Sequence, residues 1–254
     1  MIRQLARALT PNRWHISHRL QTEIVNRAGG TIVSGLFAGM RYVTQSSGSV
    51  WLPKLLGTYE RELQPYVSPM LELPFDSILV AGAAEGYYAV GFALRSRSPR
   101  VYAFEPNTRA RALLSDLATR NNVTDKIEID AICDLSHLKR CLAAHPNTLV
   151  FVDIEGGEAL LLDPELVPEL RGATIIVEVH EMAVPGVGAL LRKRFTSTHN
   201  IDEPTTQVRR AEDSPRLNGE VVWTNSSRGA MEQLLSERRG CDMSWLVMIP
   251  KLAQ

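Results

Sequence analysis

Acidic side chains and one histidine follow two short apolar runs of the sequence. The segment FVDIEGGE places Asp153 and Glu155 directly after the apolar residues 149–152, and Glu158 follows two glycines. The segment VEVHE places His180 between two glutamates. Carboxylates and an imidazole can orient a hydroxyl, take a proton or bind a hard divalent cation. We therefore predict catalytic roles for Asp153, Glu155 and His180, and we assign no metal ligand. Glu158 could simply favour the start of a helix through the helix dipole.

A turn of small residues follows the earlier apolar run at residues 78–80. We predict that this turn contacts a cofactor through Gly82, Ala83, Ala84, Glu85, Gly86 and Tyr87. Small residues let the backbone turn sharply and let a ligand approach closely. Glu105 follows the next apolar run, and a carboxylate there can accept hydrogen bonds from both hydroxyls of a ribose. The pattern indicates a nucleoside-binding site, although the glycines could instead serve packing alone.

The spacing within this turn restricts which nucleoside can bind. The dinucleotide fingerprint G-x-G-x-x-G is absent, because Ala84 and Tyr87 occupy its second and third glycine positions. A pyrophosphate needs the close approach that the second glycine allows, whereas a ligand with a ribose and no phosphate does not. S-adenosylmethionine is such a ligand. The pattern therefore argues against a nicotinamide-dependent dehydrogenase, and the lack of HExxH at His180 argues against a zinc peptidase.

Strands and helices must alternate to bring these residues together. We predict strands at residues 78–80, 101–104, 126–132, 149–152, 173–179, 220–224 and 244–249. We predict helices between them at residues 87–94, 108–120, 136–144, 158–162, 187–195 and 230–238. This alternation indicates an α/β fold with a doubly wound, mostly parallel sheet, whose ligands bind outside the carboxyl ends of the strands. Asp134, which follows the third strand, could contact an adenine or cap the next helix.

The flanking segments are less regular. We predict a helix over residues 1–28 that is broken near Pro11 and ended by two glycines. Residues 31–66 should be irregular, with a short strand near residues 40–43, and residues 196–218 should form a long loop. We divide the chain into an N-terminal helical and irregular cap, residues 1–70, and an α/β domain, residues 71–254.

The composition bounds the class of protein. The 254 residues are 44% apolar and 22% charged, which is typical of a globular chain. The formal net charge is zero, so we expect no nucleic acid partner. The three cysteines lack metal-ligand spacing, which favours a reducing compartment. No apolar run reaches the length of a membrane span, and we expect a cytoplasmic protein whose oligomeric state is left open.

Four segments carry a resemblance to a known family. In order and spacing VAGAAEGYY, VYAFEPN, FVDIEGGEALLL and IIVEVHE resemble the FkbM-type family of class I S-adenosylmethionine-dependent methyltransferases. The resemblance covers roughly residues 77–181 and implies a Rossmann-like sheet of seven strands that ends in an antiparallel pair. It implies that Gly82, Ala84 and Gly86 line the methionine and ribose part of the cofactor site. It also implies that Glu105 holds the ribose, that Asp134 lies by the adenine and that Asp153 lies by the methyl group.

The resemblance implies methyl transfer to an oxygen of a small molecule or a glycan. Asp153 or His180 would act as the base that takes the hydroxyl proton. An alternative comes from another class of function. Val80 and Ala84 replace polar residues that the family usually carries at these positions. A chain with this pattern could be a catalytically degenerate methyltransferase fold that serves as a binding or scaffold protein.

Overall fold

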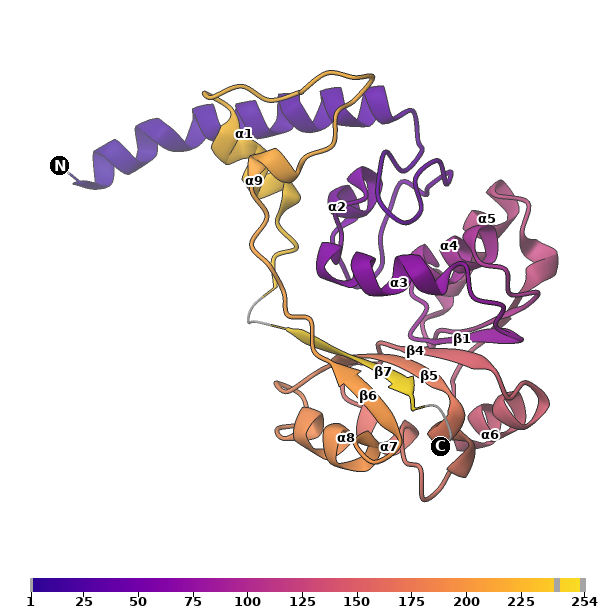
Figure 1. Ribbon diagram of the computed structural model, residues 1–254. Coiled ribbons are helices and arrows are strands. Elements are labelled where there is room, and N and C mark those ends of the chain that lie inside the picture. The colour runs from indigo at the N-terminus through magenta and orange to yellow at the C-terminus, as the bar shows by residue number, and fades with distance from the viewer. Residues whose placement is uncertain (1, 240–242, 252–254) are drawn as a thin grey trace. The chain divides into compact units, whose positions relative to one another are not determined.

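The computed structural model describes residues 2–239 and 243–251 (Figure 1). The described residues group into two compact units by their contacts. One unit comprises Met1–Arg61 with Gln207–Gly240, and the other comprises Glu62–Thr206 with Cys241–Gln254. The described contacts thus group residues 207–239 with the N-terminal residues, and the division after residue 70 stays a prediction.

The second unit contains a seven-stranded sheet in the order β3-β2-β1-β4-β5-β7-β6. Its strands are β1 (Ser77–Ala81), β2 (Val101–Phe104), β3 (Ile127–Asp130), β4 (Thr148–Val152), β5 (Thr174–Val179), β6 (His199–Asp202) and β7 (Ser244–Pro250). The first five strands pair in parallel, and β7 runs antiparallel between β5 and β6. This arrangement confirms the predicted doubly wound, mostly parallel sheet and its final antiparallel pair.

Helices cover both faces of this sheet (Figure 1). The helices of this unit are α3 (Gln64–Met70), α4 (Tyr87–Arg95), α5 (Thr108–Arg120), α6 (Leu135–Ala144), α7 (Glu158–Leu161) and α8 (Val187–Phe195). On the face covered by α4, the ring of Tyr88 lies 4.3 Å from that of Phe151 in β4. On the face covered by α6, α7 and α8, Val150 and Val152 join the apolar core. Because successive side chains of β4 face opposite covered layers, the whole strand is buried and its residues 149–152 are all apolar.

The sixth strand differs from the sequence-based expectation. Residues 220–224, predicted as a strand, form none, and only an isolated bridge joins Leu217 to Glu220. The strand β6 lies instead inside the predicted loop at residues 196–218. Its side chains are mostly polar, and only His199 is buried. Backbone pairing with β7 places it at the sheet edge, where polar strands are common, so hydrophobicity gave no signal.

The first unit contains a long N-terminal helix. The helices of this unit are α1 (Ile2–Ala28), α2 (Trp51–Leu56) and α9 (Arg228–Leu235). The predicted break near Pro11 is wrong, because α1 is continuous from Ile2 to Ala28. Gly29 and Gly30 end α1 with positive φ, as predicted. The strand predicted at residues 40–43 is absent, and a single bridge joins Thr31 to Arg41 around a tight loop.

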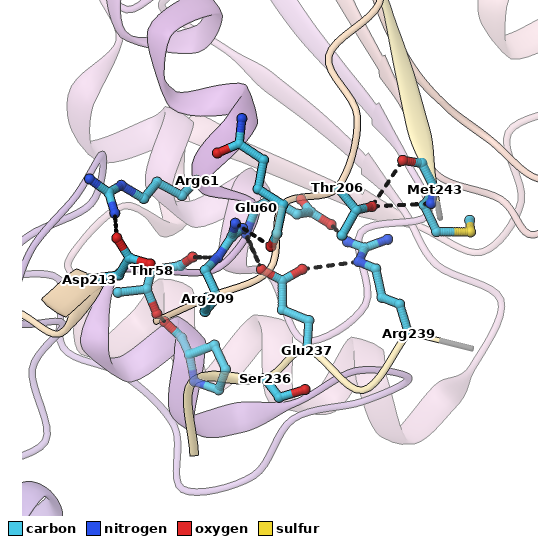
Figure 2. Close-up of polar contacts among 12 residues, drawn as sticks. Thr58, Glu60, Arg61, Thr206, Arg209, Asp213, Ser236, Glu237, Arg239 and Met243 are labelled. Carbon is cyan, nitrogen blue, oxygen red and sulfur yellow. Dashed lines mark hydrogen bonds and ion pairs between the residues drawn. The ribbon is translucent and has the colours of Figure 1, made fainter. Parts of the chain in front are cut away.

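Buried ion pairs connect distant segments within this unit (Figure 2). Arg209 Nη2 lies 2.7 Å from Glu237 Oε1, and the two side chains are only 3% and 5% exposed. Arg239 bridges Glu237 and Glu60, at 3.0 and 2.5 Å. Arg209 Nε also donates to the carbonyl oxygen of Thr58 at 3.2 Å. These contacts hold the segment after α2 against residues far along the chain.

Candidate active site

The turn between β1 and α4 lies against the end of β4. Gly82 adopts φ +84°, and a Cβ atom built there would lie 1.6 Å from the carbonyl oxygen of Asp153. Asp153 N in turn donates to Ala81 O at 2.9 Å. Ala84 adopts φ +47°, and Gly86, the N-cap residue directly before α4, adopts φ +99°. The other predicted members of the turn, Ala83, Glu85 and Tyr87, are buried. Only glycine fits at position 82, because the two chain segments touch there.

Glu105 joins this turn to the end of β2. The side chain is buried, and its Oε2 accepts a hydrogen bond from Ala84 N at 2.8 Å. Its Oε1 accepts from Asn107 N at 2.7 Å. Each carboxylate oxygen can accept a second hydrogen bond, so these contacts leave acceptor capacity for a ligand. The carboxylate is thereby held in one place at the carboxyl edge of the sheet.

A cavity of about 580 Å³ opens at this edge of the sheet. Its lining comprises Ala81, Gly82, Phe104, Pro106, Ala131, Ile132, Cys133, Asp134, Leu135, Ser136, Ile154, Gly157, Leu160 and Leu161. Most of these side chains are apolar, and Ile132 and Leu160 are 62% and 70% exposed. A mostly apolar cleft of this size with a few polar groups is typical of small-molecule sites.

Asp134 lines the cavity and also caps α6. Its Oδ1 accepts hydrogen bonds from the backbone N–H groups of Ser136 and His137, each at 2.9 Å. The same oxygen lies 2.7 Å from His137 Nδ1. The backbone N–H of His137, the Ser136 hydroxyl and the His137 ring hold the pKa of Asp134 well below its usual range. The structure therefore shows the helix-cap role, and the contact to an adenine stays a prediction.

The three predicted catalytic residues come together at the ends of β4 and β5. His180 Nε2 lies 3.5 Å from Asp153 Oδ1 and 3.5 Å from Glu155 Oε2. One ligand atom of each residue lies within 4.8 Å of the others. On its other side, His180 Nδ1 lies 2.6 Å from Oε1 of the fully buried Glu158. Glu178 Oε2 is 3.6 Å from Nε2, so four carboxylates surround one imidazole.

These carboxylates control the charge of the ring. Burial alone would lower the pKa of His180, but the hydrogen bond to Glu158 and the charges of Glu178 and Asp153 raise it to about 9. Burial alone would raise the pKa of Glu158, but the hydrogen bonds from His180 and Gly156 outweigh this effect, and the net pKa is lowered. The ring therefore carries its proton at neutral pH. A protonated ring accepts no further proton, which favours Asp153 over His180 as the base.

Sequence reasoning missed two parts of this site. Glu158 was interpreted through the helix dipole, although α7 has only four residues and the side chain contacts His180. The sequence carried one signal that Glu158 is buried, namely its position directly before the apolar run ALLL. The cavity wall was also missed. Ile132 and Leu160 are apolar residues without a distinctive spacing, so no motif could reveal them.

Comparisons with known proteins identify the fold. No family model and no curated protein sequence matches the chain. The solved structure of the precorrin-6y C5,15-methyltransferase from Geobacter metallireducens matches with a TM-score of 0.51 and 10% identity, over 75% of this chain and 90% of that chain. A precorrin 8w decarboxylase from Methanobacterium thermoautotrophicum matches at TM-score 0.45 and 16% identity, over 74% and 89% of the two chains. An rRNA methylase from Streptococcus thermophilus matches at TM-score 0.47 and 11% identity, over 75% and 98%.

The chain therefore has the fold of the class I S-adenosylmethionine-dependent methyltransferases. The expectation of S-adenosylmethionine as cofactor is in accord with these neighbours. Membership of the FkbM-type family stays a prediction. The expectation that excluded nucleic acid was wrong, because the structural neighbours include an rRNA methylase. Among the residues that the structure describes, no helix is long and apolar enough to cross a membrane, and the compartment stays a prediction.

Proposed function

We propose that this chain is an S-adenosylmethionine-dependent methyltransferase that acts on an oxygen atom. The observation that carries the proposal is the apolar cavity at the carboxyl ends of β1, β2 and β4, next to the His180 cluster. Phe104 and Pro106, on either side of Glu105, line this cavity. A buried carboxylate beside an apolar cleft suits a ligand that carries both a ribose and an adenine.

The residues present fit this cofactor. Glu105 would accept hydrogen bonds from the ribose hydroxyls, and the wall formed by Ile132 and Leu160 would contact the adenine. The absence of a side chain at Gly82 would allow close backbone approach. Bound S-adenosylmethionine supplies a methyl group that is activated for displacement by a nucleophile. Asp153 and Glu155 would orient the acceptor hydroxyl, and Asp153 would take its proton.

Calorimetric titration of the purified chain with S-adenosylmethionine and S-adenosylhomocysteine tests the cofactor. We expect micromolar binding, worth about 7 to 8 kcal/mol. Glu105→Ala should weaken binding strongly, whereas the exposed Glu165→Ala should leave it unchanged. Unchanged affinity in Glu105→Ala would refute the ribose assignment. No binding by the wild-type chain would refute the proposal in favour of a binding or scaffold protein.

A methyl-transfer assay with labelled cofactor tests the acceptor. The finer proposal is that the methyl acceptor is a hydroxyl of a small molecule or a glycan. RNA belongs in the same screen because one similar solved structure is an rRNA methylase. Asp153→Asn should lower turnover more than cofactor affinity, because it removes the carboxylate that would take the proton of the acceptor hydroxyl. Full turnover in Asp153→Asn would remove this residue from the mechanism. Label on a nitrogen or carbon atom would refute transfer to oxygen.

A further inference from the structure

The spacing around His180 Nε2 is longer than a direct hydrogen bond. Its distances to Asp153 Oδ1 and Glu155 Oε2 are both 3.5 Å, whereas N–H···O bonds are usually about 2.9 Å. Two ligand atoms at about 2.1 Å from one metal ion lie about 3 to 3.5 Å apart in tetrahedral or octahedral geometry. We propose that His180 Nε2, Asp153 and Glu155 form a binding site for a divalent first-row metal ion.

The buried Glu158 orients the histidine for this role. Its Oε1 accepts a hydrogen bond from Nδ1 at 2.6 Å, which leaves Nε2 as the nitrogen that would exchange its proton for a metal ion. Histidine ligands usually donate their second ring N–H to a carboxylate or a carbonyl in this way. Because Glu158 is fully buried and His180 is 6% exposed, the ring cannot turn without breaking this pair. The nitrogen donor is therefore held in one direction before any ion arrives.

The charges and the donor types narrow the choice of ion. Four carboxylates lie within 3.6 Å of the ring nitrogens of His180, and this negative charge, which the protonated ring partners when no metal is bound, equally favours a divalent cation that displaces the ring proton. One imidazole with two carboxylates suits Mn²⁺, Fe²⁺ or Zn²⁺, since Ca²⁺ prefers oxygen ligands alone. The Glu155 side chain is 81% exposed, so the solvent side leaves coordination positions open.

The metal site goes beyond the sequence-based expectation, which assigned no metal to these residues. Its existence depends on the geometry of the three ligands and not on methyl transfer. Its use in catalysis rests on the proposed function. An ion with open positions would bind the acceptor oxygen and increase the acidity of its hydroxyl.

Direct titration with metal alone tests the site. The full chain is stripped with a chelator and titrated with Mn²⁺, with the free ion followed by electron paramagnetic resonance, and separately with Zn²⁺ by calorimetry. We expect one ion per chain without any S-adenosylmethionine. Glu155→Gln and Asp153→Asn should each weaken binding at least tenfold. The adjacent Glu181→Gln should bind as the wild type does, because Glu181 accepts hydrogen bonds from Gly186 and Gly188 instead.

The Glu158→Gln variant tests whether Glu158 orients the His180 ring without itself coordinating the metal ion. Loss of the carboxylate that orients the ring should weaken metal binding by roughly 10–100-fold without changing the stoichiometry. Glu155 is exposed, so its substitution tests the site even if a buried variant fails to fold. Absence of stoichiometric binding of both ions, or wild-type affinity in both Glu155→Gln and Asp153→Asn, would overturn the inference. Cofactor binding without metal binding refutes the metal site alone, and metal binding without cofactor binding refutes the proposed function alone.

Discussion

His180 Nδ1 lies 2.6 Å from Glu158 Oε1, and both side chains are buried. The histidine directly follows β5 and the glutamate begins α7, so this pair joins two neighbouring connections at the carboxyl edge of the sheet. The pair fixes the ring orientation and turns Nε2 toward Asp153 and Glu155. The arrangement of the predicted catalytic residues therefore depends on Glu158, for which the sequence predicted no catalytic or binding role.

Glu158→Gln should lower the pKa of His180. Burial acts to lower this pKa, and the hydrogen bond to Glu158 is the largest of the contributions that raise it to about 9. Removal of the carboxylate charge should therefore move the titration toward acid, which NMR of labelled histidine side chains would record. Glu181→Gln is the control, because this neighbour in sequence contacts the backbone of Gly186 and Gly188. An unshifted His180 titration in Glu158→Gln would show that the other carboxylates alone set the charge.

Gly82→Ala should be more destabilising than Gly186→Ala. Both glycines have a similar positive φ, +84° and +86°, and therefore share a conformational penalty of about 1 kcal/mol. A Cβ at position 82 would lie 1.6 Å from Asp153 O, whereas position 186 has nothing within 4 Å. Relief of that overlap should cost about 1–3 kcal/mol more. Urea unfolding of both variants measures the difference. Equal free energies of unfolding would mean that the turn at residue 82 and the backbone at Asp153 move apart at little cost.

Much of the sheet could be predicted because its strands are buried on both faces. The bounds of β2 and α5 agree with the predicted residues 101–104 and 108–120. In these elements apolar periodicity and turn residues point to the same structure. The edge strand β6 was missed because its stability comes from backbone pairing with β7, which leaves no apolar pattern in the sequence.

The candidate site was predictable only in part. Topology brings Asp153, Glu155 and His180 together because all three follow adjacent parallel strands, and strand order can be inferred from a motif resemblance. The partner of the imidazole could not be inferred, since which carboxylate meets Nδ1 depends on side-chain direction. The raised pKa of His180 results from that choice and was therefore also missed.

His199→Gln should reduce the loss of stability in mild acid. Burial, the largest cause, lowers the pKa of His199 from its ordinary value of 6.5, against a smaller raising effect of its hydrogen bond to Ala173 O. Below about pH 6.5 His199 is therefore protonated in the unfolded chain while it stays neutral in the folded chain. Stability then falls as pH decreases toward the folded pKa, by at most about 1.4 kcal/mol per pH unit.

Urea unfolding between pH 5 and 7.5 checks this prediction for His199. Glutamine can keep the donor to Ala173 O, which His199 Nε2 approaches at 2.9 Å, while removing the titration. The exposed His15→Gln is the matched control and should retain the wild-type slope. A His199→Gln chain with the same pH slope as the wild type would assign the acid sensitivity to other groups.

Glu237→Gln should destabilise the first unit far more than Glu72→Gln destabilises the second. The pair of Glu237 with Arg209 is almost fully buried, and removal of one partner from such a pair costs about 3–5 kcal/mol. The pair of Glu72 with Arg97 has a similar length, 3.0 Å, but its side chains are 70% and 67% exposed, so its loss should cost about 1 kcal/mol or less.

Urea unfolding at low and high salt measures both effects. The loss in Glu237→Gln should persist in 1 M salt, because buried charges are screened little, and the loss in Glu72→Gln should vanish. Since Glu237 also contacts Arg239 at 3.0 Å, its substitution leaves two guanidinium groups without this carboxylate. Similar small losses in both variants would mean that water reaches the cluster in Figure 2 and that hydrophobic contacts hold these segments together.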